Sequence, residues 1–240
     1  MVTFAPSLMC MDLGKMNEQF EVLDRHIDLY HVDIMDGHFC KNMALTPGIL
    51  KAFRQHTGKE IDVHLMTTNP SDWIEMCAQA GATYISPHAE TINTDAFRTM
   101  QLIDSLGCKR GVVLNPATPL NYVESYLEYI DMLTIMTVDI GFAGQKFIDQ
   151  MYEKIRQAKA LRDEKGYHYK IQIDGHCNKE NYRQLAEAGA DVLVVGNAGL
   201  FGLDQDLETA CNKMQAEFDL CMLEKSCITA GYGGIGEWNN

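Results

Sequence analysis

The sequence predicts one α/β domain in which eight parallel strands alternate with helices and close into a barrel. Eight short apolar runs are separated by amphipathic stretches along the 240 residues. Strands that alternate with helices form parallel sheets, and eight strand–helix units are the number that closes a barrel. An open doubly wound sheet is the competing fold, but "PSLMCMDLGK" lacks the Gly-rich fingerprint that usually follows its first strand. We therefore predict a (β/α)8 TIM barrel.

Each strand is predicted from a short apolar run of the length that a barrel strand requires. Short apolar runs bounded by amphipathic segments are typical of such strands. The eight runs that meet this description, in chain order, are residues 2–8, 29–35, 60–66, 83–88, 109–115, 131–138, 169–174 and 191–196.

Each strand is followed by a segment that can form a helix. Residues 71–82 and 178–190 show apolar spacings of three and four with a Gly near the end, which is typical of a helix and its stop. Asn178 is the predicted N-cap of the second of these helices. The repeated "AGA" at 80–82 and 188–190 predicts tight turns from helix to strand.

One catalytic domain is expected over residues 1–225, because no linker or change in composition divides them. Residues 226–240, "SCITAGYGGIGEWNN", are Gly-rich and aperiodic. We expect this C-terminal tail to carry no chemistry.

Composition and charge exclude several classes of function. The chain carries 20 Lys and Arg against 33 Asp and Glu, a net charge of −13, which would repel a nucleic-acid backbone. The eight cysteines include no C-x-x-C pair, so we expect reduced thiols and neither a disulfide framework nor a zinc–thiolate site. The sequence shows no signal peptide and no apolar run that would span a bilayer. A cytoplasmic protein without a membrane partner is expected.

Two histidines and two aspartates fall near the carboxyl ends of predicted strands, where barrel enzymes build their sites. They are His31, Asp33, His64 and Asp174. A single strand histidine is more often an ordinary core residue, and either aspartate alone could serve a turn. Together they would be costly to bury without a shared partner, and imidazole and carboxylate ligands suit Zn, Mn, Fe or Co. The combination predicts a divalent metal site.

Glycine-rich segments follow the last three predicted strands and indicate a phosphate site. They are "DIGFAGQKF" (139–147), "DGHCN" (174–178) and "VGNAGLF" (195–201). Glycine lets backbone N–H groups approach an anion closely, so no cluster of Lys or Arg is required. Ordinary tight turns are the alternative.

Three methionines share the inward parity of the metal-site residues and would form an apolar floor under a substrate: Met35, Met66 and Met136.

These motifs, in this order, resemble the ribulose-phosphate 3-epimerase family over nearly all of residues 3–215. Within the family, "SLMCMDL", "ETIN", "GFAGQ", "DGHCN" and "VGNAGLF" are most similar to the branch that acts on D-allulose 6-phosphate. The sequence departs from the family's usual pattern at Ile140, Ala143 and His176. These departures bear on the contacts to the phosphate and on the length of the sugar that the enzyme prefers. The segments that carry the resemblance are "APSLMCMDL", "HVDIMDGHF", "DVHLM", "MTVDIGFAGQKF", "IDGHCN" and "VVGNAGLF".

The resemblance implies a role for each candidate residue. One divalent ion (Zn, Mn, Co, Fe or Mg) would be bound by His31, Asp33, His64 and Asp174, with no organic cofactor. Asp33 and Asp174 would also transfer protons on opposite faces of an enediolate. The implied substrate contacts are Ser7, His64, Met35, Met66 and Met136, and the implied phosphate contacts are Gly141, Phe142, Ala143, Gly144, Gly175, Gly196 and Asn197.

The implied reaction is the 3-epimerisation of a phosphorylated ketose in a homo-oligomeric enzyme. Interconversion of D-allulose 6-phosphate and D-fructose 6-phosphate is the first expectation, and that of D-ribulose 5-phosphate and D-xylulose 5-phosphate is the alternative. A decarboxylase or aldol-type synthase would need a lysine close to the acids, and "HVDIMDG" has none. A non-catalytic sugar-phosphate binder would not need two opposed aspartates.

Overall fold

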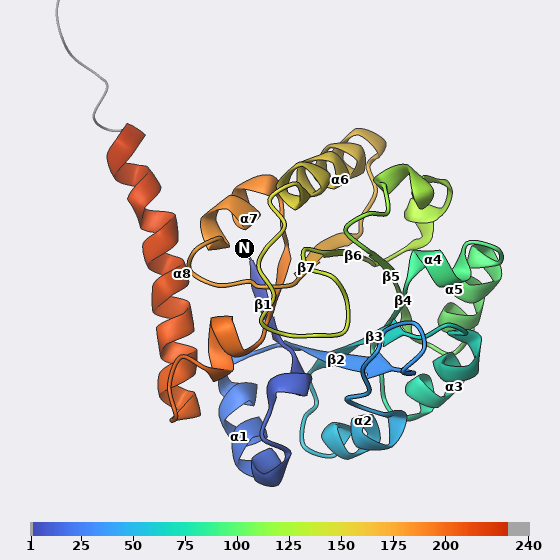
Figure 1. Ribbon diagram of the computed structural model, residues 1–240, viewed down its shortest axis with the longest axis horizontal. Coiled ribbons are helices and arrows are strands. Elements are labelled where there is room, and N and C mark those ends of the chain that lie inside the picture. Colours follow the sequence, from blue (N-terminus) through green and yellow to red (C-terminus); the bar gives the residue numbers. More distant parts are fainter. Residues whose placement is uncertain (1, 230–240) are drawn as a thin grey trace, which may run out of the picture.

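The computed structural model describes residues 2–229, with side chains through Leu223, and it confirms the predicted barrel. Eight parallel strands are hydrogen-bonded in the order β1-β8-β7-β6-β5-β4-β3-β2, and a parallel bridge from Ser7 to His31 joins β1 to β2. Figure 1 shows the strands as a central ring with the helices around it. The strands are β1 Thr3–Pro6, β2 Leu29–Met35, β3 Glu60–Met66, β4 Tyr84–Pro87, β5 Lys109–Leu114, β6 Met132–Met136, β7 Lys170–Asp174 and β8 Val192–Val195.

The helices occupy the crossovers between strands, with one exception. The segment between β5 and β6 forms two short 3-10 helices, η3 and η4, so the expectation of a regular helix after every strand is wrong there. Pro116 and Pro119 in "NPATPL" disfavour α-helix at its start. The helices are η1 Leu8–Cys10, η2 Leu13–Lys15, α1 Met16–His26, α2 Pro47–Arg54, α3 Ser71–Gln79, α4 Ala89–Ile92, α5 Ala96–Ser105, η3 Leu120–Tyr122, η4 Glu124–Tyr129, α6 Met151–Lys165, α7 Tyr182–Ala188, the π-helix η5 Asn197–Phe201 and α8 Leu207–Thr229.

Local sequence signals set the helix ends, although not all of them as predicted. Gly81 and Gly189 have φ of 101° and 113°, a conformation that glycine adopts without strain, so both "AGA" segments form the expected turns. The predicted N-cap at Asn178 is wrong, because α7 begins at Tyr182. The Asn178 side chain instead accepts a hydrogen bond from the N–H of Glu180, in a turn that precedes the helix.

The C-terminal helix α8 lies along the outside of the barrel beside α1 and α7 (Figure 1). The predicted boundary between residues 1–225 and the tail 226–240 falls near the end of this helix. Residues 230–240 lie outside the described part of the chain, so that boundary stays a prediction. Within residues 2–229, no helix is both long and apolar enough to cross a membrane.

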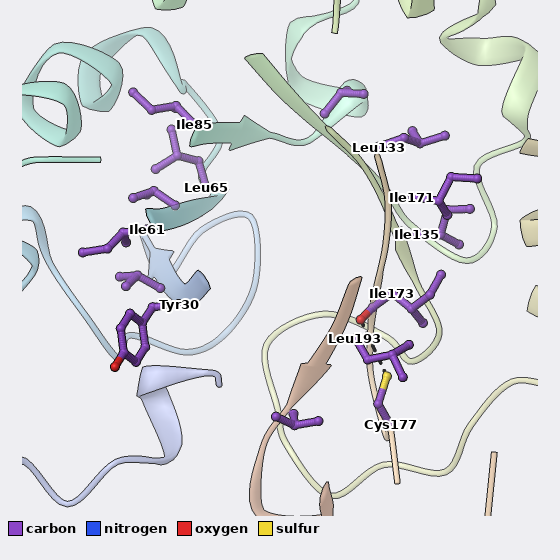
Figure 2. Packing of buried hydrophobic residues seen from close by; sticks show 14 of the residues in the cluster. Tyr30, Ile61, Leu65, Ile85, Leu133, Ile135, Ile171, Ile173, Cys177 and Leu193 are labelled. Atoms are coloured by element: carbon purple, nitrogen blue, oxygen red, sulfur yellow. Dashed lines mark hydrogen bonds between the residues drawn. The ribbon is translucent and has the colours of Figure 1, made fainter. Parts of the chain in front are cut away.

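Alternate strand residues divide the core into an outer and an inner part. Side chains that point away from the barrel axis, such as Tyr30, Ile61 and Leu193, belong to one large cluster packed under the helices. Figure 2 shows members of this cluster along β2, β3 and β4 and also along β6, β7 and β8. Complete burial of each such side chain contributes about 1.5–3 kcal/mol.

The inner part consists of layers, because strand side chains of one parity all face the axis. The lowest layer is apolar and contains Leu29, Tyr84 and Met132. The residues two positions further along these strands are His31, Ser86 and Thr134, and all three are buried and polar. The barrel interior therefore changes from apolar to polar toward the carboxyl ends of the strands.

Candidate metal centre and active site

Four side chains converge at the carboxyl end of the barrel, and they are the four that the sequence singles out. His31 and Asp33 come from β2, His64 from β3 and Asp174 from β7. One potential ligand atom from each lies within 4.8 Å of the others. Parallel pairing of β2 with β3 sets Asp33 directly beside His64.

Each imidazole of this cluster faces both carboxylates. His31 Nε2 lies 3.4 Å from Asp33 Oδ1 and 3.5 Å from Asp174 Oδ2. His64 Nδ1 lies 3.2 Å and 3.4 Å from the same two oxygens. Both histidines are fully buried, and the Asp174 side chain is 16% exposed. The cluster is therefore accessible to solvent on the Asp174 side.

The four side chains fit a divalent cation. The buried Nε2 of His31 has no hydrogen-bond partner among the described residues, although its lone pair or proton needs one. Two imidazole nitrogens and two carboxylate oxygens form a donor set that suits Zn, Mn, Co or Fe, whereas an all-oxygen set would favour Mg. A cation among these atoms would satisfy His31 Nε2 and compensate both buried charges.

The pKa values in the cluster show that it stabilises positive charge. Burial by itself lowers the pKa of His31, but the negative charge of Asp33 and the adjacent carboxylates of Asp174 and Asp62 leave it raised. Burial would raise the pKa of Asp33 and Asp174, yet the facing imidazoles hold both below their usual range. The facing imidazoles thus favour the ionised form of both carboxylates. The sequence did not show that the two imidazoles contact both acids.

A polar layer beneath the cluster holds His31 in place. Asp62 Oδ2 lies 3.0 Å from His31 Nδ1, and Ser86 Oγ donates to Asp62 Oδ1 at 2.6 Å. Gln172 Nε2 donates to Asp62 Oδ2 at 2.7 Å and to Thr134 Oγ1 at 3.0 Å. Such hydrogen bonds to ligand imidazoles fix the ring and its tautomer.

Sequence reasoning missed this layer and also missed His88 and Glu90, which adjoin His64. The signal was available for Asp62 and Gln172, because each precedes a candidate ligand by two positions on its strand. His88 lies just beyond the end of β4 and contacts His64 Nε2. Burial lowers the pKa of His88 to about 4, so its imidazole is neutral near pH 7.

A cavity of about 470 Å³ opens above the cluster and is bordered by Asp33 and Asp174. His31 and His64 are fully buried and are not among the described residues that border it. Cys10, Gln145 and His176 also border the cavity and were not predicted as site residues. The predicted substrate and phosphate residues that border it are Ser7, Met35, Met66, Met136, Gly141, Phe142, Ala143, Gly144, Gly175, Gly196 and Asn197.

The glycine loops give the far side of this cavity its shape. Gly175 has φ of 127°, and a Cβ there would lie 2.7 Å from Thr137 Oγ1, so no other residue fits without a shift. Gln145 Nε2 donates to the carbonyl oxygens of Asp139 and Phe142 and holds the loop after β6 closed on itself. Within the described part of the chain, no Lys or Arg borders the cavity. An anion bound there would rely on backbone N–H groups.

Comparison with known proteins gives matches over most of the chain. The sequence profile of the ribulose-phosphate 3-epimerase family matches residues 3–201. Ribulose-phosphate 3-epimerase from Aquifex aeolicus (strain VF5) is 41% identical over 217 residues, covering 90% of this chain and 96% of the relative. The enzyme of that name from Bacillus subtilis (strain 168) is 41% identical over 200 residues, covering 82% and 92%.

Solved structures share the fold at low sequence identity. A 3-hexulose-6-phosphate synthase aligns with a TM-score of 0.67 and 12% identity, covering 90% of this chain and 99% of that one. The 3-hexulose-6-phosphate synthase from Salmonella typhimurium aligns with a TM-score of 0.66 and 17% identity, covering 92% and 100%. At these identities the similarity shows the barrel architecture alone.

Proposed function

The chain belongs to the ribulose-phosphate 3-epimerase family, and on this premise we propose that it interconverts D-ribulose 5-phosphate and D-xylulose 5-phosphate. It is an epimerase, and therefore an isomerase of carbohydrate metabolism. The observation that carries the choice of sugar is the match, at about 40% identity over most of the chain, to relatives with this activity in their name. The alternative expected from the sequence thus becomes the first candidate.

D-allulose 6-phosphate is the second candidate substrate, with D-fructose 6-phosphate as its product. It is favoured by the motifs shared with that branch and by Ala143 and His176, which depart from the usual pattern and border the cavity. The two candidates differ by one carbon between the ketone and the phosphate. Their relative turnover therefore reports on the distance from the metal cluster to the glycine loops.

We propose that His31 Nε2, His64 Nδ1, Asp33 and Asp174 bind one divalent cation. When bound, it would supply positive charge next to the substrate oxygens on which negative charge develops. Asp33 and Asp174 are the proposed proton carriers at C3, one on each face of the planar intermediate. Ser7 Oγ donates to Asp33 Oδ2 at 2.7 Å, which supports a fixed orientation of this carboxylate.

The proposed substrate contacts divide the cavity into a polar, an apolar and an anion-binding part. Met35, Met66 and Met136 would pack against the carbon skeleton and exclude water from C3. The loops that contain Gly144, Gly175 and Gly196 would bind the phosphate through backbone N–H groups. Binding energy at the phosphate would then orient C3 between the two carboxylates.

The decisive experiment measures kcat/KM on both sugar phosphates with the same enzyme preparation and measured metal content. A higher value for the pentulose phosphate supports the proposal, and a higher value for the hexulose phosphate makes the second candidate correct. Exchange of the C3 hydrogen with solvent, followed by NMR, separates an epimerase from a sugar-phosphate binder. Absence of exchange with either sugar phosphate would overturn both candidate epimerase reactions.

Single substitutions test the two proton carriers. Asp33→Asn and Asp174→Asn should each lower kcat by at least about 100-fold, the usual contribution of a general acid or base. Asp28→Asn is the matched control, because Asp28 is exposed at the opposite end of the barrel, beside Lys59. Substantial turnover in either active-site variant would contradict the two-carboxylate mechanism.

The expected homo-oligomeric state and cytoplasmic location remain proposals. Light scattering on the purified protein tests the first, and cell fractionation tests the second.

A further inference from the structure

The second ring nitrogen of His64 leads away from the metal cluster into a chain of buried polar groups. His64 Nε2 lies 2.8 Å from His88 Nε2, and His88 Nδ1 lies 3.1 Å from Glu90 Oε2. Both imidazoles are fully buried, and the Glu90 side chain is 22% exposed. The chain thus runs from a candidate ligand on β3, past the end of β4, to the first turn of α4.

The carboxylate of Glu90 determines the direction of every hydrogen bond in this chain. Its Oε1 accepts from the backbone N–H of Asn115 at 3.0 Å and from the hydroxyl of Thr118. Burial alone would raise the pKa of Glu90, but the hydrogen bonds from His88 and Thr118 lower it to about 2. An ionised carboxylate only accepts hydrogen bonds, so His88 Nδ1 carries the proton that lies between them.

The tautomer of a neutral His64 follows from the hydrogen bonds of His88. A neutral imidazole with its proton on Nδ1 has a lone pair on Nε2, so His88 accepts at Nε2 and His64 Nε2 donates. A neutral His64 with its proton on Nε2 has its lone pair on Nδ1. That is the atom which faces Asp33 and Asp174.

We propose that Glu90 and His88 are positioning residues that hold His64 in the tautomer whose Nδ1 can bind the cation. The proposal rests on the proposed metal site. It also explains why the two candidate ligand histidines use opposite nitrogens: Asp62 accepts a hydrogen bond from the Nδ1–H of His31 directly, whereas Glu90 acts on His64 through His88.

An isosteric substitution, Glu90→Gln, should reverse the direction of the hydrogen bonds from residue 90 through His88 to His64. The backbone N–H of Asn115 points at the Oε1 position, so the amide oxygen of the glutamine belongs there. The amide NH₂ then faces His88 Nδ1 and donates to it, which moves the His88 proton to Nε2. His64 would accept at Nε2 and carry its proton on Nδ1, where the cation should bind.

Calorimetric titration of the metal-free, full-length protein with Zn²⁺ measures this effect without reference to catalysis. We expect Glu90→Gln to weaken binding by about 10- to 100-fold, the usual effect of removing a group that orients a ligand histidine. Thr118→Val is the matched control, since it removes a hydrogen bond to the same carboxylate but keeps its charge; binding should change less than about threefold. Equal affinities for Glu90→Gln and the unaltered protein would overturn the proposal.

A second measurement needs no substitution and therefore holds even where Glu90→Gln fails to fold. Nitrogen NMR of ¹⁵N-histidine-labelled protein assigns the tautomer of His88 directly. A proton on His88 Nδ1 supports the proposal, and a proton on Nε2 overturns it. Absence of Zn²⁺ binding by the unaltered protein would instead overturn the proposed metal site, so the two failures are distinguishable.

Discussion

Gly111→Ala should destabilise the barrel from the inside, because Gly111 provides the space for Ser86. Gly111 lies on β5 and faces the barrel axis. A Cβ there would lie 1.9 Å from Ser86 Oγ, 2.7 Å from Ser86 Cβ and 3.0 Å from Ser86 Cα. These distances are too short for non-bonded atoms, and the 3.0 Å contact is with the backbone Cα of Ser86. Either β5 must move away from β4 or the Ser86 side chain must leave its position.

The size of the destabilisation by Gly111→Ala follows from those two structural responses. Inserting a methyl group into a packed interior costs about 1–3 kcal/mol. Displacement of Ser86 Oγ also breaks its 2.6 Å hydrogen bond to Asp62, and loss of a hydrogen bond to a charged group costs about 1.5–3 kcal/mol. We expect the free energy of unfolding to fall by roughly 2.5–6 kcal/mol. Binding of Zn²⁺ should also weaken, because Asp62 supports His31.

Urea unfolding at fixed metal content measures the loss. Gly58→Ala is the matched control, since a Cβ at Gly58 meets no described atom within 4 Å and should leave stability unchanged within about 0.5 kcal/mol. The double variant Gly111→Ala with Ser86→Gly removes the clashing side chain and should be more stable than Gly111→Ala alone. The reasoning is refuted if Gly111→Ala unfolds at the same urea concentration as the unaltered protein.

Three further outcomes follow from the site and its supports. Chelation of the divalent cation should abolish epimerisation and lower the melting temperature, and added cation should restore both; full activity in protein shown to be metal-free would contradict the proposed site. Glu90 has a folded pKa of about 2 against its ordinary 4.5, so it stabilises the fold above about pH 4.5. That contribution is lost as the pH falls toward 2, and urea midpoints of the protein and Glu90→Gln should therefore converge on acidification. Lys154→Met should lower the free energy of unfolding by roughly 1–3 kcal/mol in urea titrations with an unchanged m-value, because the Lys154 ammonium donates to the carbonyl oxygens of Asn115, Pro116 and Thr118.

The sequence predicts the fold and the four-residue cluster because both depend on strand periodicity. His31 and Asp33 share a strand face by their spacing alone, and the carboxyl ends of parallel strands meet by topology. The 3-10 segment after β5 and the start of α7 at Tyr182 depend on loop conformations that periodicity does not encode. Boundaries were therefore predicted less well than elements.

The chain from His64 to Glu90 could not be predicted for a different reason. His88 is 24 positions from His64, and Glu90 is 25 from Asn115. Nothing in the local sequence distinguishes His88 from an ordinary residue at the end of a strand. Its role depends on the position of one ring nitrogen relative to another, which is a property of the packed barrel.

One strand pair, β2 and β3, supplies three of the four candidate metal ligands and also Asp62, which supports one of them. β2 carries His31 and then Asp33, whereas β3 carries Asp62 and then His64, and the register pairs His31 with Asp62 and Asp33 with His64. Each cross-strand pair thus joins one imidazole to one carboxylate. The same order on both strands would place like groups side by side, which is destabilising between strands. A shift of one residue would turn both pairs toward the helices, so the apolar outer face that fixes the strand register also fixes the geometry of the candidate metal centre.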